Sequence, residues 1–463
     1  MFKLSYLAIA LVAVTGSVQA QTWSRFISSG PFRTTTLASQ GLAADGLGGV
    51  FVQSLETGEL SGTDTSHIYA LDGGGNDVYP WSVVVRPGGT DTAFMSRGLS
   101  ASNGYRAAWF ETGAAGLLQD RIWGFAPEQP AGSELQLDRL DGGRVLAAST
   151  DGDGGLLVVR DRSNGWSRPV LRRYAAVGSQ WSLQWEQMLG SCYPGTVSMQ
   201  QQDVDFDLDA DPATSAVHLL GYCNGGIAGI STYYVQSFDL GGVLRAEQRF
   251  RPQMPGSLVA RHRLGDGAWA YEFAEPTGGP RSLQVADVRF GLYPLNWNPA
   301  TGALRTDAVG DGVLMGARLT SDPTQYEVAR VHRVNDAQFA VTAPRQYLWL
   351  SQFAAASTRW SADKYDRRVV AFRLETAGLP AEVALQAYGE GTVVEWYRSI
   401  DGATANGAIE MRFEPDSGEI LIAVDRQDED GSYGIQVERF WIRKPFWCPP
   451  RRYCIKPPIA PPV

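Results

Sequence analysis

Short runs of β-branched and aromatic residues, separated by turns rich in glycine and aspartate, recur along the whole chain. Residues 50–53 follow such a turn at 45–49, and residues 156–159 follow another at 151–155. Glycine and aspartate tolerate the positive φ angles of tight hairpins, while β-branched and aromatic residues favour strands. Long helical periodicity is nearly absent. The pattern therefore predicts an all-β protein built from antiparallel hairpins.

The turn signals repeat at an almost regular spacing. They lie near residues 45, 88, 141, 210, 265, 311, 366 and 416, on average 53 residues apart. Repeats of about 40–50 residues with some four strands each are typical of β-propeller blades. Eight such units fit residues 21–440, so the sequence predicts an eight-bladed β-propeller. A seven-bladed ring and a pair of β-sandwiches are the alternatives.

The two ends of this segment are predicted to meet. After the turn near residue 416 only three strands are convincing, at 408–413, 420–425 and 433–440. Residues 22–27 form a strand pattern that precedes the first unit and has no partner in it. We expect this N-terminal strand to complete the last blade, because closure hides the edges that an open sheet exposes.

The first twenty residues have the pattern of a secretory signal peptide. Lys3 supplies a short positive region, residues 4–14 are apolar, and residues 17–20 have the small-residue spacing of a cleavage site. The apolar run is too short for a bilayer, which needs about 20 residues. Gln21 follows in place of the cysteine that a lipid anchor requires. The sequence predicts an exported protein, periplasmic or extracellular and of bacterial type.

Four cysteines in an exported chain predict two disulfides. Of the three pairings, Cys192–Cys223 and Cys448–Cys454 are favoured because each joins cysteines that are neighbours along the sequence. The first would pin an excess segment near residues 180–202, which lengthens one repeat and is interpreted as an insertion. Metal binding by the thiols is the alternative, but the C-x-x-C spacing and nearby histidines are missing.

Charge separates the body of the chain from its tail. The chain has 40 basic and 49 acidic residues and a formal net charge of −9. Such a chain repels phosphate backbones, so nucleic acid is not expected as a partner. Residues 441–463 instead hold basic residues, no acid and many prolines. This disulfide-clipped tail is interpreted as a latch on the acidic body or as a contact for anionic envelope polymers.

Aspartates alternate with apolar residues along residues 203–211. In a strand, the carboxylates would line one face and the apolar side chains the other. Like charges repel, so the row requires solvent, arginine partners or a cation. Calcium accepts several carboxylate oxygens. The candidate calcium ligands are Asp205, Asp207, Asp209 and Asp211. The alternative is a solvated or arginine-paired face, and Asp425, Asp428 and Asp430 are interpreted as a polar hairpin tip.

The usual catalytic signatures are absent from the sequence. We find no H-E-x-x-H zinc helix, no G-x-S-x-G nucleophile elbow, no phosphate loop and no C-x-x-C-H haem attachment. A pair of carboxylates at the central channel could still serve a glycosidase, which needs two carboxyl groups about 5–5.5 or 6.5–9.5 Å apart. An exported hydrolase is therefore the second hypothesis for function, and a structural or assembly scaffold is the third.

Aromatic residues supply the candidate binding surface of the leading hypothesis. Exposed rings stack on sugars and on extended peptides, whereas buried rings would pack between blades. Trp181, Trp185 and Tyr193 lie in the predicted insertion, and Tyr233 follows Cys223. The leading hypothesis is an exported, non-enzymatic propeller that binds a glycan or a protein in the cell envelope or outside the cell. It needs no transmembrane segment and no cofactor other than calcium.

Overall fold

A computed structural model describes the chain from Trp23 to Trp441 with gaps. The described residues are those of strands β1 to β33 and of several short turns; residues 1–22, 442–463 and most longer connections lie outside them. All of the described regular structure is β-strand. Within the described residues, no helix has the length and apolar character needed to cross a membrane.

Five antiparallel sheets have four strands each. In chain order they are β2 (Arg33–Ala44), β3 (Val50–Gly58), β4 (Thr65–Leu71) and β5 (Val83–Val85); β6 (Ala93–Ser102), β7 (Tyr105–Ala114), β8 (Leu117–Ala126) and β9 (Gln129–Glu134); β10 (Val145–Thr150), β11 (Gly155–Arg160), β12 (Val170–Val177) and β13 (Gln180–Met188); β14 (Val204–Asp211), β15 (Ala216–Cys223), β16 (Thr232–Asp239) and β17 (Leu244–Phe250); and β18 (Ser257–Gly265), β19 (Ala268–Ala274), β20 (Ser282–Asp287) and β21 (Gly291–Pro294).

Two larger sheets complete the described part. One contains β22 (Leu304–Val309), β23 (Gly312–Arg318), β24 (Gln325–Asn335), β25 (Gln338–Val341) and β26 (Arg345–Leu348). The other contains β27 (Thr358–Ala362), β28 (Arg368–Leu374), β29 (Ala381–Tyr388), β30 (Val394–Ala403), β31 (Ile409–Glu414), β32 (Glu419–Gln427), β33 (Tyr433–Trp441) and β1 (Trp23–Ser28). Its two halves, β27–β30 and β31–β33 with β1, are joined by the single pair Ala403↔Arg426.

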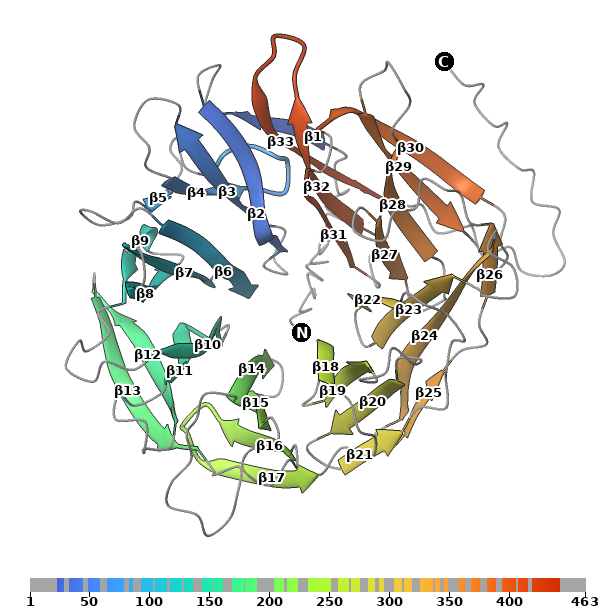
Figure 1. Cartoon of the computed structure of the whole chain (residues 1–463). Coiled ribbons are helices and arrows are strands. Elements are labelled where there is room, and N and C mark those ends of the chain that lie inside the picture. Colours follow the sequence, from blue (N-terminus) through green and yellow to red (C-terminus); the bar gives the residue numbers. More distant parts are fainter. Residues whose placement is uncertain are drawn as a thin grey trace, which may run out of the picture.

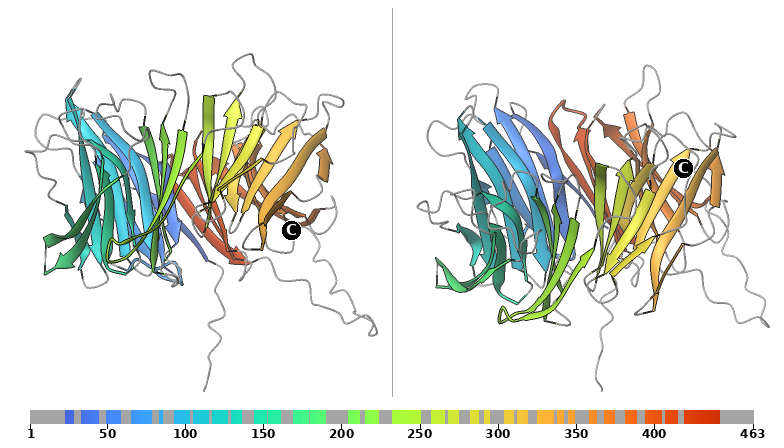
Figure 2. Two further views of the ribbon diagram at one scale, coloured as in Figure 1. Left: turned by 90° about the horizontal axis from the view of Figure 1, so that it is seen from below. Right: turned by 60° about the horizontal axis from the view of Figure 1, so that its bottom comes forward.

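The sheets are arranged as a ring around a central axis (Figure 1). The contacts between neighbouring units form a closed circuit through their innermost strands: β2, β6, β10, β14, β18, β22, β27, β31 and again β2. In the side views of Figure 2 the sheets stand side by side along this ring. The predicted all-β propeller is confirmed. The circuit has eight members among the described strands, and the choice between eight and seven blades stays a prediction.

The N-terminal strand closes the ring, as the sequence predicts. β1 pairs antiparallel with β33 over six residues, from Trp23↔Arg439 to Ser28↔Gly434. Trp23 and Ile27 are buried in one cluster with Leu421 of β32 and Val52 of β3. The strand therefore supplies backbone pairing to the last unit and apolar packing against the first.

Both faces of a sheet are covered by neighbours, which explains the continuous apolar runs. In β11, Leu157 and Val159 pack in one cluster with Leu208 of β14. Leu156 and Val158 pack in another cluster that includes residues of the preceding sheet. A strand buried on both faces loses the alternation of a half-exposed strand, so residues 156–159 are apolar throughout.

The segment interpreted as an insertion is in part a regular strand. Residues 180–188 form β13, the outermost strand of the sheet β10–β13, and pair with β12 from Val177↔Gln180 to Val170↔Met188. The prediction that these nine residues are extra to the repeat is therefore wrong. Gln184 is skipped in the pairing, and this bulge disturbs the alternation by which a strand is recognised. Residues 190–202 of the predicted insertion lie outside the described part.

Candidate functional site

The bulge in β13 turns its two tryptophans to opposite faces of the sheet. Trp185 is paired with Arg173 and Leu183 with Tyr174, so Gln184 has no position in the register. Without the extra residue, Trp181 and Trp185 would share a face, because strand alternation has a period of two. The extra residue inverts the alternation. Trp181 faces the sheet β6–β9 and Trp185 faces the sheet β14–β17.

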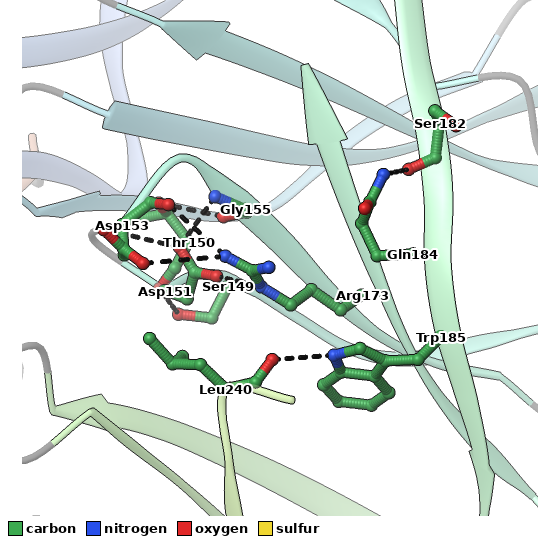
Figure 3. Close-up of polar contacts among 10 residues, drawn as sticks. All are labelled: Ser149, Thr150, Asp151, Asp153, Gly155, Arg173, Ser182, Gln184, Trp185 and Leu240. Atoms are coloured by element: carbon green, nitrogen blue, oxygen red, sulfur yellow. Dashed lines mark hydrogen bonds and ion pairs between the residues drawn. The ribbon is translucent and has the colours of Figure 1, made fainter. Parts of the chain in front are cut away.

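Each of these tryptophans anchors β13 to a neighbouring sheet. The Trp181 Nε1 donates to the carbonyl oxygen of Ser133 in β9 at 3.2 Å, and its ring lies against Gly124 of β8. The Trp185 Nε1 donates to the carbonyl oxygen of Leu240 at 2.8 Å, as Figure 3 shows. Both indole N–H groups and part of each ring are thus used within the fold, as expected for half-buried tryptophan.

Trp23 makes the same kind of contact where the ring closes. Its Nε1 donates to the carbonyl oxygen of Gly73 at 3.1 Å, in the turn between β4 and β5. The ring lies over Gly75, where an added Cβ would be 2.5 Å from the Trp23 Cδ2 atom. Trp185 lies over Gly242 in the same way, at 2.7 Å. Both glycines have positive φ, 79° and 83°, so each position favours glycine for backbone and packing reasons alike.

Each of the two turns beneath Trp23 and Trp185 contains an aspartate whose side chain accepts hydrogen bonds from the backbone of the turn. The Asp72 Oδ1 accepts the amide N–H groups of Gly74 at 2.8 Å and Asn76 at 2.9 Å. The Asp239 Oδ1 accepts the N–H group of Val243 at 2.9 Å. These backbone donors, chiefly Asn76 and Val243, hold the pKa of Asp72 and of Asp239 below the usual value. The turns are thereby preformed for the indole that rests on them.

A buried ion pair holds the turn between β10 and β11 (Figure 3). The Asp151 Oδ1 accepts the N–H groups of Asp153 at 2.8 Å and Gly155 at 2.7 Å. Its other oxygen accepts from the Nε of Arg173 in β12 at 2.6 Å, and the Arg173 Nη2 reaches the Asp153 carbonyl oxygen at 3.3 Å. All four polar contacts lie within one sheet, so this carboxylate has a structural role.

Replacing Arg173 with methionine is expected to lower the free energy of unfolding by about 3 kcal/mol, because it leaves a buried carboxylate without its cation. The matched control is Arg245→Met. Arg245 is paired with Asp239 in a similar turn, but its side chain is 64% exposed, and exposed pairs contribute at most about 1 kcal/mol. Urea unfolding of the two variants measures both values. Equal losses would contradict a buried role for the Asp151–Arg173 pair.

The sequence does not predict the burial of two further carboxylates, those of Glu56 and Asp425. Glu56 of β3 is 1% exposed; its Oε2 lies 3.0 Å from the His67 Nε2, and its Oε1 accepts from the Tyr69 hydroxyl at 3.3 Å. Asp425 of β32, interpreted as part of a polar hairpin tip, is instead 5% exposed. The signal that could have revealed Asp425 is its position directly after the apolar run 420–424.

Asp425 joins the last unit of the ring to the first. Its Oδ1 accepts the N–H group of Leu37 in β2 at 2.6 Å, and its Oδ2 accepts the N–H group of Ala408 at 2.7 Å. Burial raises the pKa of Asp425, and the two amide donors and the charge of Arg373 oppose that rise. Both carboxylate oxygens accept hydrogen bonds from backbone N–H groups, so Asp425 links the last unit to the first where the ring closes.

The aspartate row forms a strand, as its pattern predicts, and this strand is the innermost one of its sheet. β14 pairs with β15 over all eight residues. Phe206 and Leu208 are buried against the sheet β10–β13. The side chains of Asp205, Asp207, Asp209 and Asp211 lie outside the described part. Among the side chains that are described, no three His, Cys, Asp or Glu residues are grouped so that they could hold a metal ion. Calcium binding by the row stays a prediction.

Thermal melting with and without calcium tests that prediction. Calcium bound only by the folded protein must raise the melting temperature of a sample previously stripped with EDTA. The rise should disappear when Asp207 and Asp209 are both replaced with asparagine, and it should persist in the control Asp428→Asn in a distant turn. An unchanged melting temperature at millimolar calcium would leave the solvated or arginine-paired face as the explanation.

The remaining predicted residues are only partly described. Tyr233 lies in β16, where its backbone pairs with Tyr222 and Phe250, and its side chain lies outside the described part. Tyr193, Cys192, Cys448 and Cys454 are also outside it. Cys223 ends β15. Both disulfide pairings and the ligand role of the two tyrosines therefore stay predictions.

Exposed apolar side chains are concentrated on two neighbouring sheets. Five of the seven large exposed hydrophobic residues in the described part belong to the outer strands and turns of β10–β13 and β14–β17. We call these residues the outer patch: Val177 (61% exposed), Leu183 (48%), Met188 (57%), Val243 (54%) and Leu244 (46%). Leu183 and Met188 lie on the face of β13 that carries Trp181, and Val177 lies on the other face of the sheet. The hydrogen bond from Trp185 to Leu240 joins the two sheets that carry these residues.

No protein-family model matches the sequence, and no curated protein matches it either. Solved structures resemble the chain at low identity. The β-propeller domain of the trilobed protease from Pyrococcus furiosus is 7% identical over 76% of this chain and 94% of that domain, with a TM-score of 0.37. YCF48 from Cyanidioschyzon merolae is 11% identical over 90% of this chain and 98% of that chain, with a TM-score of 0.37.

Prolyl oligopeptidase B from Galerina marginata is 10% identical over 73% of this chain, with a TM-score of 0.38. The chain spans about half the length of this peptidase and of a prolyl endopeptidase, 45% and 54% of their chains. The strand order, the pairing and the closed circuit of contacts carry the assignment of the fold.

Proposed function

We propose that this protein is an exported, non-enzymatic β-propeller that binds a protein ligand outside the cytoplasm through its outer patch. The observation that carries the proposal is the concentration of exposed aliphatic side chains on two neighbouring sheets. Leaving such side chains in water is unfavourable, and their concentration on one part of the described surface supports an interaction site there. The ring provides a rigid support for this patch.

A protein ligand agrees better with the described surface than a glycan does. Sugars are gripped by exposed aromatic faces, but Trp181 and Trp185 donate their N–H groups to neighbouring sheets and cover glycines there. The exposed residues of the patch are aliphatic. Aliphatic side chains beside a strand are suited to a polypeptide, which supplies apolar side chains and a hydrogen-bonding backbone.

A binding role is also consistent with the hydrogen bonds of the two buried carboxylates, whose partners all belong to the fold. Asp151 accepts two backbone N–H groups and an arginine, and Asp425 accepts two backbone N–H groups. A general acid needs a carboxyl group that can reach a substrate proton. These two carboxylates are committed to the fold, so the raised pKa of Asp425 reflects burial at the ring closure.

Export is tested by the mass of the protein that is recovered outside the cytoplasm. Cleavage after Ala20 predicts a mature chain that starts at Gln21. Recovery of only the uncleaved chain, in the cytoplasm, would contradict the exported location. The binding surface is tested separately.

Binding is tested by photo-crosslinking in the cells that produce the protein. Benzoylphenylalanine replaces Gln184, which is exposed and adjacent to Leu183, and in the control it replaces Tyr433, which is 40% exposed on a distant sheet. We expect a discrete adduct from position 184 and none from position 433. The adduct should be digested by protease, and it should be lost when Leu183 is replaced with serine.

Three outcomes would overturn the proposed function. An adduct sensitive to glycosidases but not to proteases would identify a glycan ligand. An adduct of two copies of this chain would identify self-association. No adduct, or equal adducts from both positions, would show that the outer patch is not a binding site.

A further inference from the structure

We infer that the protein ligand contributes an extended strand that pairs with the outer edge of β13, as a fifth strand of the sheet β10–β13. This inference rests on the proposed function, since it specifies how the ligand binds at the outer patch. β13 is the last strand of its sheet and has a hydrogen-bonded neighbour, β12, on one side among the described strands. Its exposed edge offers backbone N–H and C=O groups to a partner.

The phase of the hydrogen bonds places one of these groups at Met188. The Leu189 N–H donates to the carbonyl oxygen of Pro169 at 2.9 Å, which makes these residues a hydrogen-bonded pair. In an antiparallel ladder such pairs alternate with pairs whose backbone groups point away from each other. Met188 is paired with Val170, next in the ladder. Its N–H and C=O groups therefore point to the open side of the sheet.

β13 lacks the features that protect the outer strands of three other described sheets. Edge strands are commonly blunted by charge, by proline or by short length. β17 carries Arg245, Glu247 and Arg249, β9 contains Pro130, and β5 has only three residues. β13 has nine residues and a single charged side chain, Glu186, which is paired with Arg172 at 2.7 Å. This edge is therefore less protected against an added strand than the edges of β5, β9 and β17.

The edge is also held in place before a ligand arrives. Trp181 and Trp185 fasten the strand to the neighbouring sheets on either side through their indole N–H groups. A strand that is already ordered loses little conformational entropy when a partner pairs with it. The tryptophans that the sequence offers as ligand contacts would thus support binding indirectly, by positioning the edge.

The side chains beside the edge define the chemistry of the added segment. The register places Leu183 and Met188 on the same side of β13 as Trp181, because Leu183 is paired with Tyr174 and Met188 with Val170. An added strand directs alternate residues to that side. The ligand segment should therefore be extended, low in charge, free of proline where it pairs, and apolar at alternate positions.

Met188→Pro and Met188→Ala separate backbone pairing from side-chain contact. Proline removes the N–H group that would bond to the ligand, and β12 does not use that group, so the sheet should tolerate the change. Alanine removes the apolar side chain and keeps the N–H group. With the crosslinker at position 184, we expect the proline variant to reduce adduct formation about tenfold below that of the alanine variant. Equal adduct yields from the two variants would overturn strand addition. If the adduct still forms in both, the proposed binding function is supported independently.

Hydrogen exchange with the ligand captured by crosslinking gives a second readout that needs no substitution. We expect the Met188 amide to exchange fast in the free protein and slowly in the complex. Slow exchange in the free protein would mean that the chain's own residues cover the edge, which overturns the inference. Fast exchange in both states would do the same. Failure to capture any ligand at position 184 would overturn the inference together with the proposed function.

Discussion

Replacing Asp425 with alanine is expected to lower the free energy of unfolding by about 4 kcal/mol. The change leaves the N–H groups of Leu37 and Ala408 without the oxygens that they meet at 2.6 and 2.7 Å. Each buried donor left unsatisfied costs about 1–3 kcal/mol. The loss falls on the contact between the last and the first units of the ring, so we expect the whole ring to unfold more readily. Urea unfolding followed by tryptophan fluorescence measures the loss.

Asp428 provides the matched control for Asp425. It lies three residues further along, in the turn between β32 and β33, and its side chain is 39% exposed. Asp428→Ala should change the free energy of unfolding by no more than about 0.5 kcal/mol. Equal decreases in the free energy of unfolding for the two variants would contradict a stabilising role of Asp425 at the ring closure.

The raised pKa of Asp425 gives its contribution a defined dependence on pH. Burial lifts the pKa of the folded state above that of the unfolded chain, about 3.9. The titration of Asp425 therefore favours the folded state fully below that unfolded value, and this contribution is lost as the pH rises through the folded pKa. Asp425→Asn removes the titration. The stability difference between the wild type and this variant should be largest in acid and should decrease as the pH rises.

Unfolding measured from acid to neutral pH checks this dependence. The variant Asp428→Asn again serves as the control, because it also removes one carboxyl group from the same part of the chain. A difference between the wild type and Asp425→Asn that stays constant with pH, or increases toward neutral pH, would contradict the assigned direction of the pKa shift.

The second large effect is expected at the turn beneath Trp23. Gly75→Ala should lower the free energy of unfolding by about 3 kcal/mol, of which about 1 comes from the positive φ and the rest from overpacking. An added Cβ would lie 2.5 Å from the Trp23 Cδ2 atom. The indole cannot simply move away, because its N–H group donates to the Gly73 carbonyl oxygen in the same turn.

Gly431 isolates the backbone part of that loss. Its φ is 85°, close to the 79° of Gly75, but the nearest atom to an added Cβ is the Gln427 Nε2 at 4.0 Å. Gly431→Ala should therefore cost only about 1 kcal/mol. In a Trp23→Ala background, Gly75→Ala should fall to the same value, which a double-mutant cycle by urea unfolding would measure. Equal losses at Gly75 and Gly431 in the wild type would contradict anchoring by Trp23.

How far the sequence predicts the fold is clearest at β14 and β1. The alternation of residues 203–211 predicts a strand with one apolar face, and Phe206 and Leu208 are buried as that pattern requires. The closing strand follows from the pattern too, because the last unit is one strand short and residues 22–27 lack a partner. Both predictions depend on local signals, namely the period of two in strands and the turn residues between them.

The site was less accessible to such signals. Trp181 and Trp185 are four residues apart, and their separation onto opposite faces depends on one bulged residue, Gln184. A bulge has no reliable local pattern, so the sequence predicts an insertion with exposed ligand contacts where the structure has a regular strand with anchoring tryptophans.

By itself the sequence determined the all-β architecture, the positions of many strands and the strand that closes the ring, because short-range alternation and turn chemistry specify these features. The tertiary structure alone decided the roles of the individual polar and aromatic side chains. Asp425 is buried and links two units because it accepts a hydrogen bond from Leu37, 388 residues away. The tryptophans anchor their strands because they contact other sheets. Burial and hydrogen bonding are properties of the neighbours that a ring brings together, and those neighbours are distant in the chain.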